Sequence, residues 1–128
     1  MNTFDFDPAR YADAGAMIGN IHAAGLRLAL WHTPYLAPGA EPLYSQAIDA
    51  GYFPPVKGTN INTWGPPLDV TVPEATAFWR SNLARYIDLG VEGFKLDFAE
   101  DIAGGLGGAR SGWTFHDGQT DRTMADGY

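Results

Sequence analysis

Two long stretches of the chain repeat apolar residues at helical spacing. In the first, Tyr11–Ala24, they recur at i, i+3, i+4 and i+7, as on one face of a helix: Ala14, Met17, Ile18 and Ile21. The second, Pro73–Leu89, has proline in its first turn and an apolar side made by Ala75, Phe78, Trp79, Leu83, Tyr86 and Ile87. Gly25 and Gly90 follow where glycine commonly ends a helix. The pattern predicts two helices.

Each predicted helix leads into a short segment that alternates like a strand. Leu26–Trp31 places three leucines on one face and Arg27, Ala29 and Trp31 on the other. Val91–Phe98 places Phe94, Leu96 and Phe98 on one face and Gly93, Lys95 and Asp97 on the other. Helices that alternate with strands imply parallel strands joined by helical crossovers, so we predict an α/β fold.

Long irregular segments follow both strands. The first loop begins at His32, a short helix is expected over Glu41–Ala50 with its end at Gly51, and Tyr52–Leu68 is loop again. Glycine-rich loop also covers Ala99–Gly118, after which residues 120–128 begin another helix. Active sites of α/β folds lie at the carboxyl ends of the strands, so functional residues are expected where these loops begin.

Composition and charge exclude several classes of function. A length of 128 residues fits one domain rather than two, and 45% apolar with 13% aromatic residues is too hydrophobic for a disordered chain. The 8 basic and 15 acidic side chains give a net charge of −7, which opposes binding to nucleic acid or an anionic membrane. No apolar run approaches the roughly 18 residues of a membrane-spanning helix. We therefore expect neither nucleic acid nor a membrane among the partners.

The sequence also points away from metals and cofactors. It has no cysteine, and the three histidines His22, His32 and His116 do not have the spacing of a metal motif. No glycine-rich segment has the strand–glycine–helix context of a phosphate loop. The first residues do not form a signal peptide, and the absence of cysteine suits the cytosol without excluding secretion, so a cytoplasmic location is favoured.

The sharpest cluster of polar residues lies at the end of the second strand. Lys95 and Asp97 are two residues apart and share one face, and Glu100 and Asp101 follow. A nearby ammonium favours an ionised carboxylate, which can act as a nucleophile or as an electrostatic stabiliser. The solvated polar face of an edge strand gives the same alternation. A Mg²⁺ site is a third interpretation, although Lys95 disfavours a second cation.

Aromatic side chains in the loops are candidates for sugar binding. Trp31 ends the first strand on the face away from the leucines, where it is either a platform for a sugar or ordinary packing at the rim of a core. Trp64 and Trp113 are weaker candidates of the same kind, and Trp79 is expected in the core. His32, next to Trp31, is a further candidate for a ligand contact.

The segment GVEGFKLDFAE, residues 90–100, resembles glycoside hydrolase family 31, in the branch of bacterial α-xylosidases and related α-glycosidases. That family carries a strand ending in Lys-x-Asp-Phe-Gly-Glu. Five further segments resemble family motifs in the family's order: Phe6-Asp7-Pro8 with the helix after it, Leu30–Tyr35, Gly51–Phe53, Asp69–Ala75 and Phe115–Gly118. The resemblance therefore extends over nearly the whole chain.

The resemblance implies an architecture: a partial TIM (β/α)8 barrel with about half of the barrel's βα units. Because such a barrel takes about 250 residues, residues 1–128 would be a partial glycoside hydrolase catalytic barrel domain, incomplete at both ends. Such a piece leaves barrel surface uncovered, so self-association is expected.

The resemblance also implies retaining hydrolysis of an α-glycoside or oligosaccharide, without metal or cofactor. Asp97 would be the catalytic nucleophile that forms a glycosyl-Asp intermediate, and Lys95 a ligand of a sugar hydroxyl that supports its ionisation. Trp31 would line the sugar subsite with Phe98 beside it, and Glu100 would orient the surroundings of the nucleophile.

Departures from the family pattern limit what the resemblance implies. Ala99 replaces a glycine and Thr33 replaces an asparagine, both beside proposed site residues, so the resemblance does not determine which sugar is bound. Val72 replaces a helix-capping asparagine. The family's acid/base aspartate lies on a later strand outside these residues, so we expect the isolated chain to be inactive. The alternatives are a non-catalytic sugar-binding or inert fragment and an α-galactosidase-type barrel.

Overall fold

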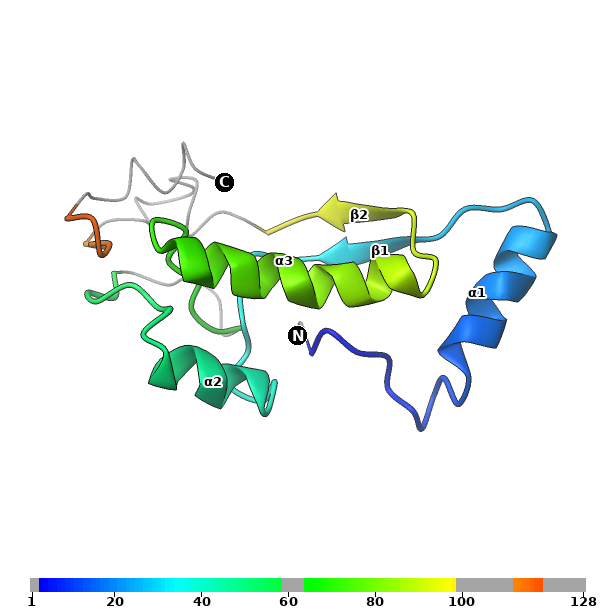
Figure 1. Ribbon diagram of the computed structural model, residues 1–128, viewed down its shortest axis with the longest axis horizontal. Helices are drawn as coiled ribbons and strands as arrows, with labels where there is room; N and C mark the ends of the chain where they lie inside the picture. The colour runs from blue at the N-terminus through cyan, green and yellow to red at the C-terminus, as the bar shows by residue number, and fades with distance from the viewer. Residues whose placement is uncertain (1–2, 59–63, 99–111, 119–128) are drawn as a thin grey trace.

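The chain forms three helices and two short parallel strands in the computed structural model, which describes residues 3–58, 64–98 and 112–118. Their order is α1 (Ala14–Ala23), β1 (Ala29–His32), α2 (Leu43–Asp49), α3 (Pro73–Asp88) and β2 (Gly93–Leu96). The strands pair in parallel with Trp31 beside Lys95, and α3 runs along the sheet (Figure 1). The prediction of an α/β fold with parallel strands and a helical crossover is confirmed.

The helices begin and end close to the predicted positions. At the start of α1 the Asp13 carboxylate accepts a hydrogen bond from the backbone N–H of Ala16 at 2.7 Å. The extended residue before α3 is Val72, whose side chain cannot accept such a bond. Each helix is followed by a glycine with positive φ, a conformation that side chains disfavour: Gly25 at 75°, Gly51 at 68° and Gly90 at 103°.

Both strands are shorter than the alternation predicted. β1 begins only at Ala29, although the Leu28 carbonyl already accepts a hydrogen bond from Glu92 N–H at 3.0 Å. Leu26 lies before β1 and is 63% exposed, so the predicted strand is wrong at that residue. Ile87 is likewise 57% exposed and does not belong to the buried side of α3. The sheet is therefore short, and it positions the residues that follow the carboxyl ends of its two strands.

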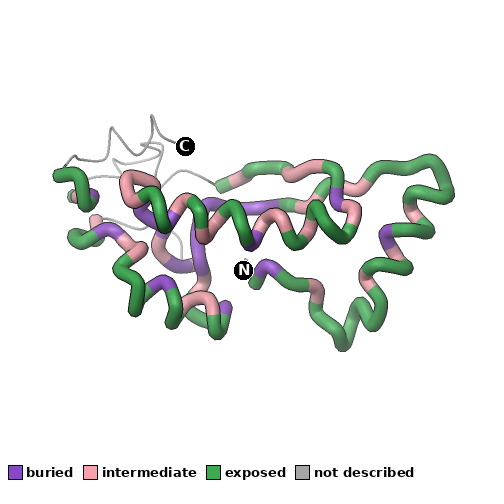
Figure 2. Tube along the Cα trace, in the orientation of Figure 1, coloured by how far each residue is buried: buried purple, intermediate pink, exposed green. Residues whose placement is uncertain are grey.

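The largest apolar core lies beyond the carboxyl end of the strands. Its buried residues come from the N-terminal segment, the loop after β1, α2, the loop before α3 and α3 itself. They are all at most 2% exposed: Phe4, Leu36, Ala40, Ala47, Leu68 and Ala75. Trp79 packs against it as predicted. Figure 2 shows this burial between α2, α3 and the segment that follows β1, whereas α1 is mostly exposed. Burial of this kind fixes the loops that the strands lead into.

His32 lies on the face of β1 that α3 covers. Its ring is 5.3 Å from Trp79 and 5.8 Å from Phe94, centroid to centroid, and the residue is 5% exposed. Burial lowers the pKa of His32 to about 4, so the imidazole is neutral at pH 7. Its Nε2 has no hydrogen-bond partner within the described part of the chain. The expectation that His32 reaches a ligand at the strand end is not met, because strand alternation turns it toward the helix.

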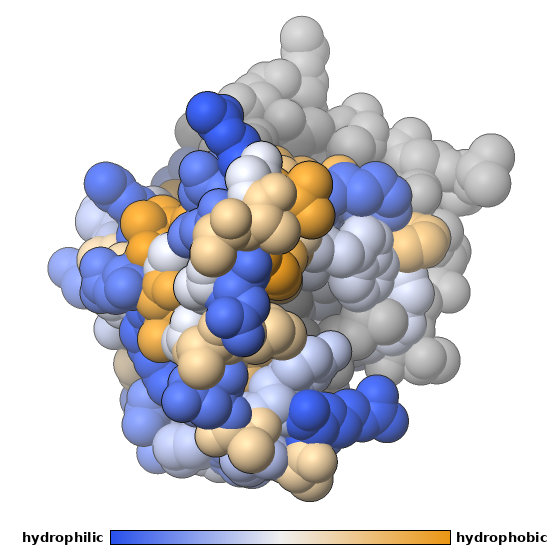
Figure 3. Space-filling view, turned by 90° about the vertical axis from the view of Figure 1, so that its right-hand side faces the viewer, coloured by the Kyte–Doolittle hydropathy of each residue, from blue (hydrophilic) through white to orange (hydrophobic). Residues whose placement is uncertain are grey.

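The amino-terminal end of the sheet, next to α1, is less buried than the carboxyl end. Ile18 is the buried residue of α1, and Gly90 passes this helix so closely that a Cβ there would be 3.1 Å from the Ile18 Cγ2. A hollow of about 500 Å³ lies here beside His22 and Ile87, and Figure 3 views this end with apolar groups exposed among charged ones. Glu92 forms ion pairs with His22 at 3.3 Å and Arg27 at 3.7 Å.

In the parts of the chain described, no helix has the length and apolar character needed to cross a membrane.

The buried, neutral His32 predicts how stability depends on pH. The unfolded chain binds a proton at His32 near pH 6.5, but the folded chain binds it only near pH 4. The stability that the neutral, buried His32 contributes is therefore complete above pH 6.5 and is lost as the pH falls through 4. A pKa shift of this size corresponds to at most about 3 kcal/mol of the free energy of unfolding. We expect His32→Leu to flatten the fall in the free energy of unfolding between pH 7 and pH 4, measured by urea denaturation. Parallel pH profiles of variant and wild type would contradict the buried neutral state.

Candidate active site

Asp97 follows β2 directly, at the carboxyl edge of the sheet. Its Oδ2 accepts hydrogen bonds from Lys95 Nζ at 2.5 Å and Trp31 Nε1 at 3.0 Å, and its Oδ1 accepts one from the Phe98 backbone N–H at 3.1 Å. Its own N–H donates to the His32 carbonyl at 3.0 Å, which continues the parallel pairing by one residue. The carboxylate is thus fixed by both strands at once.

The parallel register explains why these groups meet. Trp31 and Lys95 are direct neighbours across the sheet, and Asp97 is two residues beyond Lys95 on the same face. The side chain of Asp97 is 32% exposed and that of Lys95 is 68% exposed, so both remain accessible to a ligand. The predicted pairing of Lys95 with Asp97 is present, and it involves a third group, the indole of Trp31.

Three aromatic rings lie around the carboxylate. Phe98 lies 5.5 Å from Trp31 and 4.5 Å from Trp64, and the two indoles are 6.1 Å apart, all with steep interplanar angles. Phe98 has a φ of 58°, which is rare for a residue with a side chain. The alternation placed Phe98 with Phe94, and that prediction is wrong, because this left-handed residue carries its ring to the side of Trp31.

The hydrogen bonds keep Asp97 ionised. The bond from Lys95, followed by that from Trp31, holds the pKa of the Asp97 carboxyl below its usual value, and the slight burial that opposes them is outweighed. An ionised carboxylate among aromatic rings can attack an electrophilic carbon or stabilise a developing positive charge. Such an arrangement suits the chemistry of a sugar ring, whose apolar faces pack on aromatic side chains.

Some predicted site residues cannot be placed. Glu100, together with Ala99 and Asp101, lies outside the described residues, as does the helix predicted over residues 120–128. Within the described ranges, no group of three or more histidine, aspartate or glutamate side chains is arranged to hold a metal ion. Thr33 is buried next to the site, at 1% exposure.

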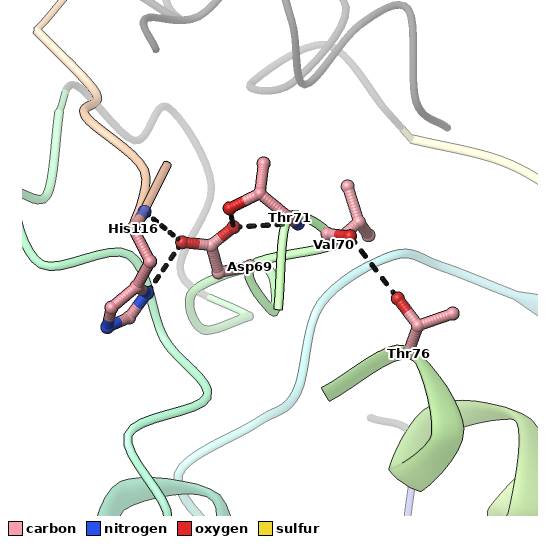
Figure 4. Close-up of polar contacts among 5 residues, drawn as sticks. All are labelled: Asp69, Val70, Thr71, Thr76 and His116. Atoms are coloured by element: carbon pink, nitrogen blue, oxygen red, sulfur yellow. Dashed lines mark hydrogen bonds and ion pairs between the residues drawn. The ribbon is translucent and has the colours of Figure 1, made fainter. Parts of the chain in front are cut away.

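A second buried carboxylate lies on the loop before α3. Asp69 is fully buried and its Oδ2 accepts hydrogen bonds from the His116 backbone N–H at 2.8 Å and from His116 Nδ1 at 2.7 Å (Figure 4). Its Oδ1 accepts two more from Thr71. Sequence reasoning assigned Asp69 no role; the pattern Asp-x-Thr indicates a local turn, but nothing local indicates the contact with His116.

Comparisons with known proteins identify the family of the chain. Residues 1–126 match the sequence profile of the glycosyl hydrolases family 31 TIM-barrel domain. The chain belongs to glycoside hydrolase family 31. The predicted resemblance and the predicted partial TIM barrel are therefore confirmed.

Two curated relatives are named as α-xylosidases. The chain is 32% identical to the alpha-xylosidase of Emericella nidulans, covering 98% of this chain, and 30% identical to alpha-xylosidase XylQ of Lactiplantibacillus pentosus, covering 78%. It spans only 16% and 14% of those two proteins.

Solved structures of family 31 enzymes share the fold. A dextranase of Flavobacterium johnsoniae, complexed with glucose, superposes with a TM-score of 0.79 at 17% identity, over 97% of this chain and 16% of its own. A sulfoquinovosidase of E. rectale gives a TM-score of 0.71 at 21% identity, over 97% and 18%. At such identities the likeness establishes the architecture, in which β1 and β2 are neighbouring strands of the barrel.

The contacts of Asp97 predict how its titration responds to substitution. Lys95→Met removes the strongest of the bonds that lower the pKa of Asp97, so the pKa should rise, and Trp31→Phe should raise it by less. The measurement is the ¹³C NMR titration of the Asp97 carboxyl carbon. Lys57→Met is the matched control, because it removes an exposed lysine that does not contribute to the shift of the Asp97 pKa, and it should leave this pKa nearly unchanged. An unaltered titration in Lys95→Met would contradict the assignment.

Proposed function

We propose that Asp97 is the catalytic nucleophile of a retaining α-glycosidase. The observation that carries the proposal is the position of its carboxylate, which Lys95 and Trp31 hold ionised at the carboxyl edge of a parallel sheet. Family 31 membership supports a glycosidase, and the relatives named as α-xylosidases support an α-glycoside or oligosaccharide as substrate.

In the proposed reaction an oxygen of Asp97 attacks the anomeric carbon of the bound sugar. The glycosidic C–O bond breaks, and the leaving oxygen takes a proton from a second carboxylic acid. Water then attacks the same carbon with that second group as base, the bond to Asp97 breaks, and the carboxylate is restored. Lys95 also binds a sugar hydroxyl, because its exposed ammonium has donors to spare beyond Asp97.

The aromatic rings complete the proposed subsite. Trp31 is 41% and Phe98 40% exposed, although both rings contact other aromatic side chains. Exposed rings beside a carboxylate suit the apolar face of a sugar, whose anomeric carbon would then face Asp97. Glu100 follows three residues later, and we propose that it orients the surroundings of the nucleophile.

We propose further that the 128 residues are one part of a catalytic barrel domain, since a complete barrel takes about 250 residues. The second carboxylic acid would then come from another part of that domain. The isolated chain is therefore expected to bind sugar and to form the covalent bond with an activated donor, but not to turn over ordinary glycosides.

A fluorinated glycosyl fluoride separates these steps, because fluoride leaves without a proton from the acid. We expect slow labelling of the isolated chain by 5-fluoro-α-xylosyl fluoride, located at Asp97 by mass spectrometry of peptides. The Asp97→Asn variant should not be labelled, while Asp49→Asn, an exposed aspartate of α2, should behave like the wild type.

Two outcomes contradict the proposal. Labelling of Asp97→Asn would exclude Asp97 as the nucleophile, and turnover of an aryl α-xyloside by the isolated chain would exclude the need for a second carboxylic acid from elsewhere. Absence of labelling together with saturable quenching of tryptophan fluorescence by xylose would instead indicate the non-catalytic, sugar-binding alternative.

We also propose that the isolated chain self-associates. Within the described residues each strand pairs only with the other, and apolar side chains are exposed in β2, as Leu96 at 73%, and just before β1, as Leu26 at 63%. Sedimentation velocity should show species larger than 13.8 kDa at raised concentration, and Leu96→Lys should reduce them. A purely monomeric chain at all concentrations would contradict this.

A further inference from the structure

We propose that Asp69 and His116 are positioning residues that hold Trp64 against Phe98 beside Asp97. The importance of that position for sugar binding rests on the function proposed above, but the position itself does not. Neither residue touches Asp97 in any contact that the structure gives. They would act through an intervening aromatic cluster.

The first step is the contact between Asp69 and His116. Both oxygens of the buried carboxylate are occupied, one by Thr71 and the other by the main chain and ring of His116. Although burial opposes ionisation, the bonds from Thr71 and His116 together hold the pKa of Asp69 below its usual value. The ring Nδ1 therefore donates to a charged acceptor, which makes the bond stronger than a neutral one.

The second step is the loop that carries Asp69. The Asp69 backbone N–H donates to the Tyr52 carbonyl at 2.7 Å. Thr76, in the first turn of α3, directs its hydroxyl to the Val70 carbonyl at 3.4 Å (Figure 4). Asp69 is thus anchored to the helix and to the loop after α2, so it is the fixed member of the pair. His116 belongs to the segment 112–118, which it attaches to that fixed point.

The third step leads from this segment to the site. Trp113 and Phe115, 3% and 2% exposed, form a buried cluster with Tyr35, against which Trp64 packs. The backbone of Thr114 between them pairs with Val56 through two hydrogen bonds of 3.1 and 3.4 Å. His116 follows directly, so its attachment to Asp69 keeps both aromatic side chains in the cluster.

The fourth step places Trp64 between the cluster and the site. Its ring centroid lies 6.2 Å from that of Tyr35 in the cluster, and 4.5 Å from Phe98 and 6.1 Å from Trp31 at the site. The next residue, Gly65, has a φ of 122°, and a Cβ there would be 2.1 Å from the Leu36 carbonyl oxygen. The backbone beside Trp64 therefore has little freedom, and the cluster around Tyr35 is one of the contacts that support its ring.

Fluorine NMR of the 5-fluorotryptophan-labelled chain tests this directly. The four tryptophans give four signals, which single Trp→Phe variants assign. We expect His116→Gln to shift or broaden the signals of Trp113 and Trp64, because the glutamine amide reaches the place of Nε2 rather than that of Nδ1. His116→Asn, whose amide nitrogen takes the place of Nδ1, should restore both signals. Trp79, which packs on the other core, should be unchanged in both variants and reports that the fold is intact.

The outcomes separate the inference from the proposed function. A shift of Trp113 with Trp64 unchanged in His116→Gln, or the same Trp64 signal in the Gln and Asn variants, would overturn the positioning role. A collapse of the Trp79 signal in the Asn variant would overturn it too, by showing that the pair supports the whole fold. Because the NMR experiment contains no sugar, a response of Trp64 supports the positioning role even if Asp97 is not labelled.

If both proposals hold, the labelling rate links them. His116→Gln and Trp64→Phe should each slow the labelling of Asp97 several-fold, and the double variant should be no slower than the more impaired single variant. Independent, multiplicative effects would show that His116 does not act through Trp64. His116→Asn should label at close to the wild-type rate.

Discussion

The parallel pairing of β1 with β2 is the constraint on which the candidate site depends. Its register sets Trp31 beside Lys95, and one further backbone bond, from Asp97 to His32, extends it past the end of β2. A slip of one residue would turn either set of side chains to the helix-covered face, because alternate residues of a strand point to opposite sides. The indole and the ammonium therefore meet on a single carboxylate oxygen only in this register.

The surroundings of the site are held by loops more than by the sheet. The main core lies past the strand ends, between the loop after β1, α2 and α3, and a second aromatic cluster around Tyr35 lies beside it. Burial at this edge keeps the loops in place, while the opposite end, with α1 and its hollow, is exposed. This distribution fits a barrel whose active site is built from the loops that follow its strands.

Much of the fold followed from local sequence. The spacing of apolar residues located α1 and α3, the glycines after the helices marked their ends, and the Lys95–Asp97 spacing identified the polar face of β2. The errors occurred where local pattern and tertiary packing disagree. Alternation cannot foresee the positive φ of Phe98, and it treated His32 as accessible although α3 covers it. Glu100 lies outside the described residues, so its role remains a proposal.

By itself the sequence determined the helices, the parallel strand order and the face shared by Lys95 and Asp97, because these depend on residue spacing along one segment. Only the tertiary structure decided that Trp31 donates to Asp97, that Trp64 lies against Phe98 and that Asp69 binds His116. These contacts join residues 66, 34 and 47 positions apart in the chain. The packing of distant segments fixes such contacts, and no local pattern of polar and apolar residues contains that information.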